Sequence, residues 1–132
     1  MIVVDSNVLA YLYLPGEFTE EAERLLEADP EWHTPILWRS KFRIILAGYL
    51  RRGDLGFDQA YALQREAEES LSGGEHEADS KQVLELLTAS DCSACDCCEF
   101  MAVAETLGAN LVTLDAKLLK AFPGTAKSPC AG

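Results

Sequence analysis

Residues 2–12 of the sequence read IVVDSNVLAYL, and this stretch decides the fold. A short aliphatic run without alternation is typical of a strand that is buried on both faces of a parallel sheet. Asp5 ends the run, and the apolar residues that follow Ser6 and Asn7 have the spacing of a helix. Asp5 therefore either caps that helix or serves as a functional carboxylate at the tip of a buried strand.

The rest of the chain repeats this alternation of short strands with helices. ANLVTLD, at 109–115, is another aliphatic strand that ends in a carboxylate, and a very short strand is expected around 32–34. The segment 72–79 has the composition of a loop. Apolar periodicity predicts helices over 6–14, 18–29, 35–53, 56–71, 80–90 and 94–108. This order indicates an α/β domain whose parallel sheet is covered on both faces.

The helix expected over 35–53 contains a lysine in an unusual position. Pro35 suits its first turn and Gly53 suits its end. The apolar stripe of this helix is formed by Trp38, Phe42, Ile45 and Tyr49. Lys41 lies at the edge of the stripe, so the helical period directs it partly inward. A lysine stem that snorkels and keeps its amine at the surface is the alternative.

Length and composition limit the class of protein. The chain has 132 residues, which fits a single domain over 1–132 that is large enough to bury a core. Its longest apolar run is too short to span a membrane, and we expect no export leader. Four of the five cysteines lie within 92–98, too close together to pair with one another. A cytoplasmic, reducing environment fits this cysteine usage best.

The net charge of −11 argues against binding of nucleic acid over a broad face. The basic residues are nevertheless clustered, since five of the eleven lie within fourteen positions: Arg39, Lys41, Arg43, Arg51 and Arg52. Such a cluster is either a solvated helix face or a local site for a polyanion such as RNA.

Three aspartates are candidates for a functional site. Asp5 and Asp115 each follow a predicted strand, so both should lie at the carboxyl edge of the sheet, where α/β proteins place their sites. Asp96, at the start of the helix expected over 94–108, can reach the same edge. Converging carboxylates repel one another unless a cation lies between them, and Mg²⁺ or Mn²⁺ suits such oxygen ligands. Each aspartate can also be a helix cap, and spacing alone leaves both interpretations open.

Five segments, taken in order, carry a family resemblance over nearly the whole chain. They are IVVDSNVLAYL, HTPILWRSKFRIILAGYLRRG, SAC followed by Asp96, FMAVAETLGANLVTLDAKLLKAFPG and the terminal SP. Together they resemble bacterial PIN-domain proteins of the VapC toxin type. The resemblance implies a three-layer α/β/α sandwich around a short parallel sheet, and frequent homodimerisation. It also implies a Mg²⁺- or Mn²⁺-dependent endoribonuclease that a cognate antitoxin neutralises.

The resemblance assigns metal-binding and catalytic positions to Asp5, Asp96 and Asp115. The family's other acid belongs in WRSEFRN within the long helix, but this chain has WRSKFRI at 38–44. Lys41 therefore stands where a glutamate is expected. An ammonium directed into the acid cluster would pair with the carboxylates and weaken metal binding, by several kcal/mol on the scale of near-surface charge interactions.

Two functional hypotheses follow. In the first, Asp5, Asp96 and Asp115 hold a metal ion that activates water against an RNA phosphodiester, and Arg39, Arg43, Arg51 and Arg52 help to seat the strand. In the second, the protein is a catalytically weak or inactive PIN protein with a binding or regulatory role, because Lys41 takes the place of the ion.

The identity of the third acid is open. In the resembled pattern an aromatic residue follows the aspartate after three positions, whereas Phe100 comes four after Asp96. One residue is thus inserted, and the helix register can place Cys97 at the acidic position. Asp91 and Glu99 are possible substitutes, although we favour Asp96.

Other kinds of site fit the sequence less well. Structural zinc usually requires two separated ligand pairs, whereas the cysteines form one compressed cluster, with His33 and His76 far along the chain. An aspartyl-nucleophile phosphatase would have a second carboxylate at position 7, where this chain has Asn7. Ser6 and Asn7 either cap the first helix or assist Asp5 by holding a water or a phosphate.

Overall fold

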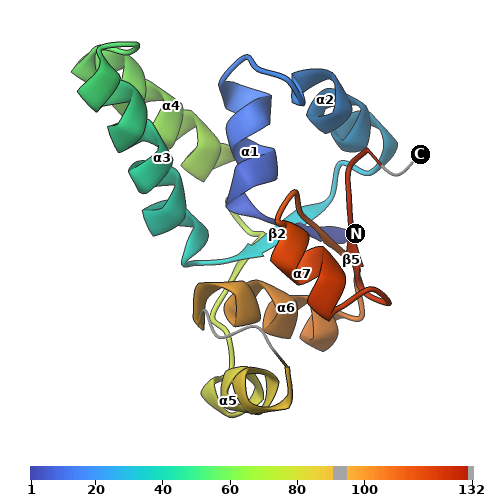
Figure 1. The fold of residues 1–132 in the computed structure, drawn as a ribbon. Coiled ribbons are helices and arrows are strands. Elements are labelled where there is room, and N and C mark those ends of the chain that lie inside the picture. The colour runs from blue at the N-terminus through green and yellow to red at the C-terminus, as the bar shows by residue number, and fades with distance from the viewer. Residues whose placement is uncertain (91–94, 131–132) are drawn as a thin grey trace.

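A computed structural model describes residues 1–90 and 95–130, with the side chains of 95–97 outside the description. Within this part of the chain, the centre is a parallel sheet with the strand order β3-β2-β1-β4-β5 (Figure 1). Its strands are β1 (Ile2–Val4), β2 (Trp32–Pro35), β3 (Glu75–His76), β4 (Leu111–Val112) and β5 (Ala126–Lys127). The central strand β1 pairs with β2 on one side and with β4 on the other.

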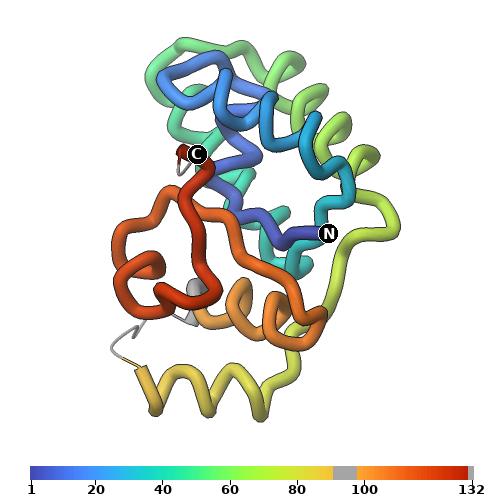
Figure 2. Tube along the Cα trace, turned by 90° about the vertical axis from the view of Figure 1, so that its right-hand side faces the viewer, coloured from blue at the N-terminus to red at the C-terminus, as the bar shows by residue number. Residues whose placement is uncertain are grey.

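Helices cover both faces of this sheet, as the sequence predicted. In Figure 1, α1 to α4 lie on one side of the sheet and α5 and α6 on the other, and Figure 2 shows the same layers after a quarter turn. The helices are α1 (Ser6–Tyr13), α2 (Thr19–Ala28), α3 (Trp38–Arg52), α4 (Phe57–Ser70), α5 (Ser80–Ala89), α6 (Cys95–Leu107) and α7 (Ala116–Ala121). The predicted α/β/α sandwich is confirmed.

The long helix α3 forms an arm together with α4. The two run side by side away from the sheet, and α1 packs against both (Figure 1). Gly53 ends α3 with a φ of 79°, a left-handed conformation that glycine adopts without strain. The expectation for Pro35 was wrong, because Pro35 is the last residue of β2 and the helix begins only at Trp38.

Two strands were missed by the sequence analysis. The segment 72–79 was expected to be a loop, but it contains β3, and β5 lies near the carboxyl end of the chain. Both are edge strands of two residues, too short to show the periodicity on which strand prediction depends.

The core lies on both faces of β1. Val3 and Val4 are fully buried, as are Trp38 and Phe42 from α3 and Phe100 from α6. The aliphatic run of residues 2–4 is thus covered from both sides, as expected for a central parallel strand. Within the described residues, no helix is both long and apolar enough to cross a membrane.

Candidate active site

The candidate site lies where the strand order of the sheet reverses. From β1 the chain builds outward to β2 and β3, and then returns through α5 and α6 to place β4 on the other side of β1. Sites in open α/β sheets form at such a point, beyond the carboxyl ends of the strands. Asp5 directly follows β1 and Asp115 follows β4, so the structure brings these two predicted acids to neighbouring strand ends.

Asp5 is almost completely buried, with 1% of its surface exposed. One carboxylate oxygen accepts a hydrogen bond from the backbone N–H of Ser6 at 2.7 Å, and the backbone carbonyl of Asp5 accepts from the first turn of α1. The helix-cap interpretation is therefore correct for this residue. A functional role for Asp5 is not excluded by this cap, because the other oxygen of its carboxylate faces β4.

Thr113 connects the two acids. Its hydroxyl donates to Asp5 Oδ2 at 2.8 Å and accepts from the backbone N–H of Asp115 at 3.0 Å. Asn7 supports the same link, since its side-chain oxygen accepts from the N–H of Leu114 at 3.2 Å and its amide lies 3.5 Å from Asp5 Oδ2. The sequence analysis missed Thr113, although its place two residues before Asp115 on a strand that ends in an acid could have indicated it.

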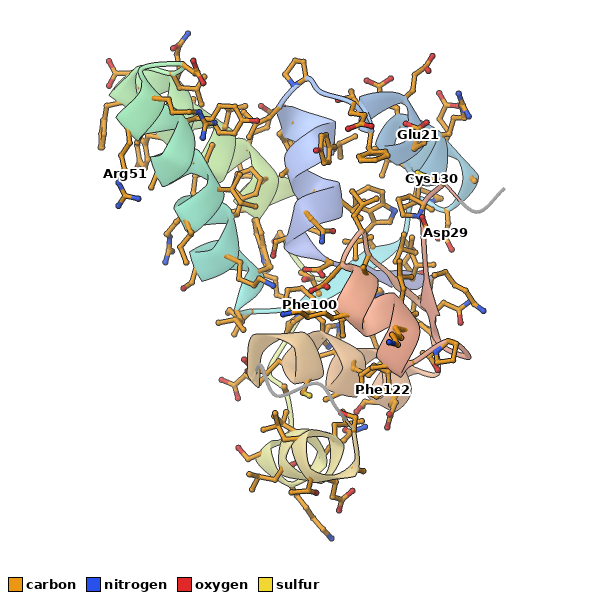
Figure 3. All side chains as sticks on the ribbon, viewed as in Figure 1. Glu21, Asp29, Arg51, Phe100, Phe122 and Cys130 are labelled. Atoms are coloured by element: carbon orange, nitrogen blue, oxygen red, sulfur yellow. The ribbon has the colours of Figure 1, made fainter. Side chains whose placement is uncertain are left out.

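Lys41 points into this site. Its ammonium nitrogen lies 3.5 Å from Asp5 Oδ1 and 4.9 Å from the centre of the Phe100 ring. Figure 3 shows Phe100 between α6 and the strand ends, at the centre of the molecule. An aromatic face attracts a cation, so Asp5 and Phe100 together form an environment suited to an ammonium group. The inward orientation predicted from the helical period is therefore observed, and the snorkelling alternative is not.

Asp115 also acts as a helix cap. One of its carboxylate oxygens accepts from the backbone N–H of Lys117 at 2.9 Å, at the start of α7. The side chain is partly exposed, in contrast to that of Asp5. Asp115 thus lies on the solvent side of the candidate site, and its role as a metal ligand stays a prediction.

The remaining acids of the prediction are placed only in part. Asp96 belongs to the first turn of α6, which packs against β1, β2 and β4, but its side chain is outside the described residues. Asp91 lies wholly outside them. Glu99 is partly exposed on α6. The question of which residue supplies the third acid, including the alternative register at Cys97, therefore stays a prediction.

Ser6 has an unsatisfied hydroxyl next to Asp5. The residue is 1% exposed, and its Oγ has no hydrogen-bond partner among the residues that the structure describes. A buried polar group without a partner is rare and is often found where a ligand or water binds. The accessory role of Ser6 stays a prediction, and its hydroxyl is a group with which a molecule in the site could form a hydrogen bond.

The described residues do not form a divalent-metal site. No group of three or more His, Cys, Asp or Glu side chains among them could hold a metal ion. The cation nearest to Asp5 in this part of the chain is the Lys41 ammonium, and the second carboxylate oxygen is held by Thr113 and Asn7. Among the described residues, the surroundings of Asp5 therefore differ from the pattern that the resemblance implies in having Lys41 where a glutamate is expected.

The arginines of the basic cluster on α3 differ in how far their charges are used within the fold. Arg39 donates two hydrogen bonds of 2.7 Å to Glu75 and one of 3.3 Å to Glu68, so its charge is used within the fold. Arg52 pairs with Asp54 at 3.0 Å but is 58% exposed, and Arg43 is equally exposed. Arg51 extends from the outer side of the arm (Figure 3). Arg43, Arg51 and Arg52 remain the accessible candidates for contact with RNA.

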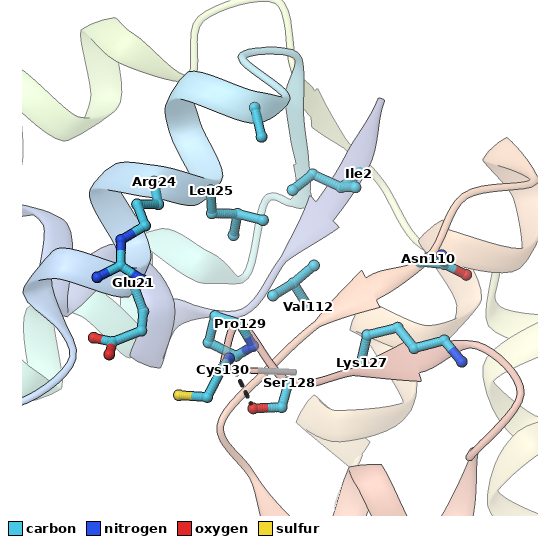
Figure 4. A pocket seen from close by; sticks show the side chains of 11 residues that line it. Ile2, Glu21, Arg24, Leu25, Asn110, Val112, Lys127, Ser128, Pro129 and Cys130 are labelled. Atoms are coloured by element: carbon cyan, nitrogen blue, oxygen red, sulfur yellow. Dashed lines mark hydrogen bonds between the residues drawn. The ribbon is translucent and has the colours of Figure 1, made fainter. Parts of the chain in front are cut away.

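A separate hollow of about 420 Å³ lies between α2 and strands β1, β4 and β5 (Figure 4). Its floor is apolar and includes Ile2, Leu25 and Val112. Lys127 is at its rim, but the amine of this residue donates to the carbonyl of Pro123 at 3.3 Å. This hollow is not part of the acid site.

The sequence model of the PIN domain matches residues 2–123, nearly the whole chain. The chain belongs to the PIN domain family. A relative of this PIN domain is Ribonuclease VapC3 from Pyrobaculum aerophilum, which is 32% identical over 125 residues, or 92% of this chain and 95% of the relative.

Solved structures share the fold of this PIN domain. A toxin–antitoxin complex from Klebsiella pneumoniae matches with a TM-score of 0.69 at 18% identity, over 98% of each chain. The FitAcB structure from Neisseria gonorrhoeae matches with a TM-score of 0.72 at 16% identity, also over 98% of each chain. At these identities the likeness establishes the fold.

Proposed function

We propose that this PIN domain is a ribonuclease-type toxin of a toxin–antitoxin pair in which Lys41 weakens metal-dependent RNA cleavage. The observation that carries the proposal is the 3.5 Å contact between the Lys41 ammonium and Asp5 at the switch point of the sheet. We thus infer an RNA-cleaving type of PIN domain in which the central acid, Asp5, is already paired with a cation of the same chain, the Lys41 ammonium.

The RNA and antitoxin parts of the proposal rest on the relatives. The relative with 32% identity is named a ribonuclease, and a structural neighbour with nearly complete coverage is a toxin–antitoxin complex. We infer an antitoxin partner and an RNA substrate class for this chain as well. The expected homodimer and the cytoplasmic location are kept as further predictions of the same proposal.

The proposal also states that the chain binds a divalent metal ion only weakly. Mg²⁺ or Mn²⁺ would be held by Asp5, Asp96 and Asp115, and such an ion supplies an activated water and stabilises charge on a phosphate. In this chain it would have to displace the Lys41 ammonium from Asp5. Two positive charges about 4 Å apart repel each other by about 4 kcal/mol at a moderate effective dielectric, so a metal ion beside Lys41 should bind weakly and cleavage should be slow.

Calorimetric titration with Mn²⁺ and cleavage of a labelled single-stranded RNA test the proposal together. We expect weak or undetectable heat for the wild-type chain, and for Lys41→Glu at least tenfold tighter Mn²⁺ binding together with metal-dependent cleavage. Lys81→Glu, an exposed position on α5, makes the same change of net charge away from the site and serves as the control. Tight Mn²⁺ binding and strong cleavage by the wild type would instead support the fully active enzyme.

A further inference from the structure

A chain of three side chains crosses the β2–β3 edge of the sheet. His33 on β2 and His76 on β3 have ring nitrogens 2.8 Å apart, between Nδ1 of the first and Nε2 of the second. The other nitrogen of His33 lies 2.8 Å from a carboxylate oxygen of Glu31. These are the two histidines of the sequence, and neither has a role in the proposed acid site.

The contact between the rings sets a limit on protonation. Two facing nitrogens at 2.8 Å form a hydrogen bond only if one donates and the other accepts. Glu31 accepts from Nε2–H of His33, which leaves Nδ1 of that ring as the acceptor for Nε2–H of His76. A first added proton can go to the far nitrogen of His76 without disturbing this bond. A second proton must go to His33 Nδ1, and it removes the acceptor and places two positive charges in contact.

The surroundings of the pair act on its protonation in opposite directions. Burial, and then the nearby His33, lower the pKa of His76 below its ordinary value. Carboxylates face the pair from its other neighbours: Glu31 precedes β2, Glu75 is the other residue of β3, and Glu77 and Asp79 line a small hollow of about 100 Å³ with His76. The α6 residues in that hollow, Val103, Thr106 and Leu107, carry no charge. Glu75 is already held by Arg39 and Trp38, so it does not serve as a partner for His76.

We propose that the His33–His76 pair is a proton-operated latch that holds the edge strand β3 against β2 and releases it when both rings are protonated. β3 has only two residues, and its backbone pairing includes the N–H of Thr34 donating to Gly74 at 2.9 Å and the N–H of Ile36 donating to His76 at 2.8 Å. Besides this backbone pairing, β3 is held by the bonds that Glu75 accepts from Trp38 and Arg39, so the histidine pair is one of a small number of contacts that retain the strand. The latch therefore acts on the strand that also carries Glu75 and, through Arg39, contacts the first turn of α3.

Hydrogen exchange of the Thr34 and Ile36 amides, corrected for the intrinsic exchange rate, measures opening of β3 directly. In the wild-type chain we expect protection of both amides to fall about tenfold between pH 7 and pH 5, which corresponds to roughly one pKa unit of linkage. His76→Gln retains an amide donor toward His33 but does not titrate, so its protection should be constant over this range. Equal pH dependence in the two proteins would overturn the proposal.

A second measurement uses the wild-type chain, so it does not depend on whether His76→Gln folds. The imidazole proton resonances of the two histidines can be followed by NMR in the wild type from pH 8 to pH 4.5. The latch requires that the rings titrate as a coupled pair in two steps, because the second proton removes the acceptor between the rings and places two positive charges in contact. Glu31→Gln should move the second step to lower pH, because the carboxylate that favours a charged His33 is gone. Two independent single-step titrations near pH 6.5 would sink the idea.

Discussion

Asp5 requires partners because a buried carboxylate is costly without them. It has them from three directions: the Ser6 amide, the Thr113 hydroxyl and the Lys41 ammonium. Lys41 is thus as much a structural counter-charge as an obstacle to a metal ion. Removing one partner of a buried ion pair commonly costs about 3–5 kcal/mol, because the other charge is left uncompensated.

Lys41→Met should therefore destabilise the fold by about 2–4 kcal/mol, somewhat below the range for a fully buried pair because a quarter of the lysine side chain is exposed. Urea denaturation followed by circular dichroism measures this change. Lys81→Met on the exposed face of α5 is the matched control and should change the free energy of unfolding by less than about 0.5 kcal/mol. Equal effects of the two substitutions would show that the contact with Asp5 is not stabilising.

Thr113→Val removes the hydroxyl that links Asp5 to Asp115 while keeping the shape of the side chain. We expect a loss of about 1–3 kcal/mol in the free energy of unfolding, because a buried carboxylate oxygen and a backbone N–H both lose a partner. Thr34→Val is the matched control, since Thr34 is equally buried but donates a longer bond of 3.3 Å to the neutral carbonyl of Val4. A smaller loss at 113 than at 34 would contradict the proposed link.

The positions of Asp5, Asp115 and Lys41 in the fold could be predicted from the sequence, but the hydrogen-bond network around them could not. An acid after an aliphatic run, such as Asp5, is visible in the sequence because strand ends place side chains at one edge of the sheet. The inward direction of Lys41 followed from the helical period. The role of Thr113 depends on the pairing of β1 with β4, which brings together residues 108 positions apart. Such pairing leaves no local signal in the sequence.

At the level of elements, β3 is joined to α3 by Glu75. This residue accepts bonds of 2.7 Å from Trp38 and twice from Arg39, so a strand of two residues is fixed to the first turn of the long helix. The sequence analysis assigned Arg39 to RNA binding because a helix face shows only which residues are exposed in isolation. The sequence did not show that Glu75, on the edge strand β3 that was not predicted, is the partner of Arg39.

Glu75→Gln should weaken this connection and alter the response to acid. The bonds from Arg39, and to a lesser extent the one from Trp38, hold the pKa of Glu75 below its ordinary value of 4.5. A carboxylate with a lowered pKa stabilises the fold above its ordinary pKa, and that stability is lost as the pH falls below about 4.5. The wild type should therefore lose more stability than the variant between pH 5 and pH 3, as measured by urea denaturation at each pH. Parallel losses would exclude this role for Glu75.

Close approach of β3 to β2 can be tested at Gly74. A Cβ atom at this position would lie 2.5 Å from the carbonyl oxygen of Trp32, too close for any side chain. Gly74→Ala should thus destabilise the protein by about 1–3 kcal/mol through forced backbone movement. Gly124→Ala, where a Cβ would meet nothing within 4 Å, should be close to neutral in the same thermal-shift assay.

For the whole molecule, the net charge of −11 limits how RNA can be bound. If contacts are confined to Arg43, Arg51 and Arg52, the logarithm of the association constant for single-stranded RNA should fall with the logarithm of salt concentration with a slope of about −2. Fluorescence anisotropy in EDTA measures binding without cleavage. Arg51→Ala should reduce the slope by about 0.7, whereas Arg24→Ala on α2 should leave it unchanged. A slope much steeper than −2 would require a larger basic surface than the arm provides.

The position of β1 at the centre of the sheet also has a consequence for biosynthesis. Asp5 is made 108 residues before Thr113, with which it shares a hydrogen bond, and β4 is made just before Thr113. Domains fold as units during or after synthesis, so β1 can complete its pairing only after β4 has been made. A nascent chain therefore cannot complete the acid site before β4 and Thr113 have been made.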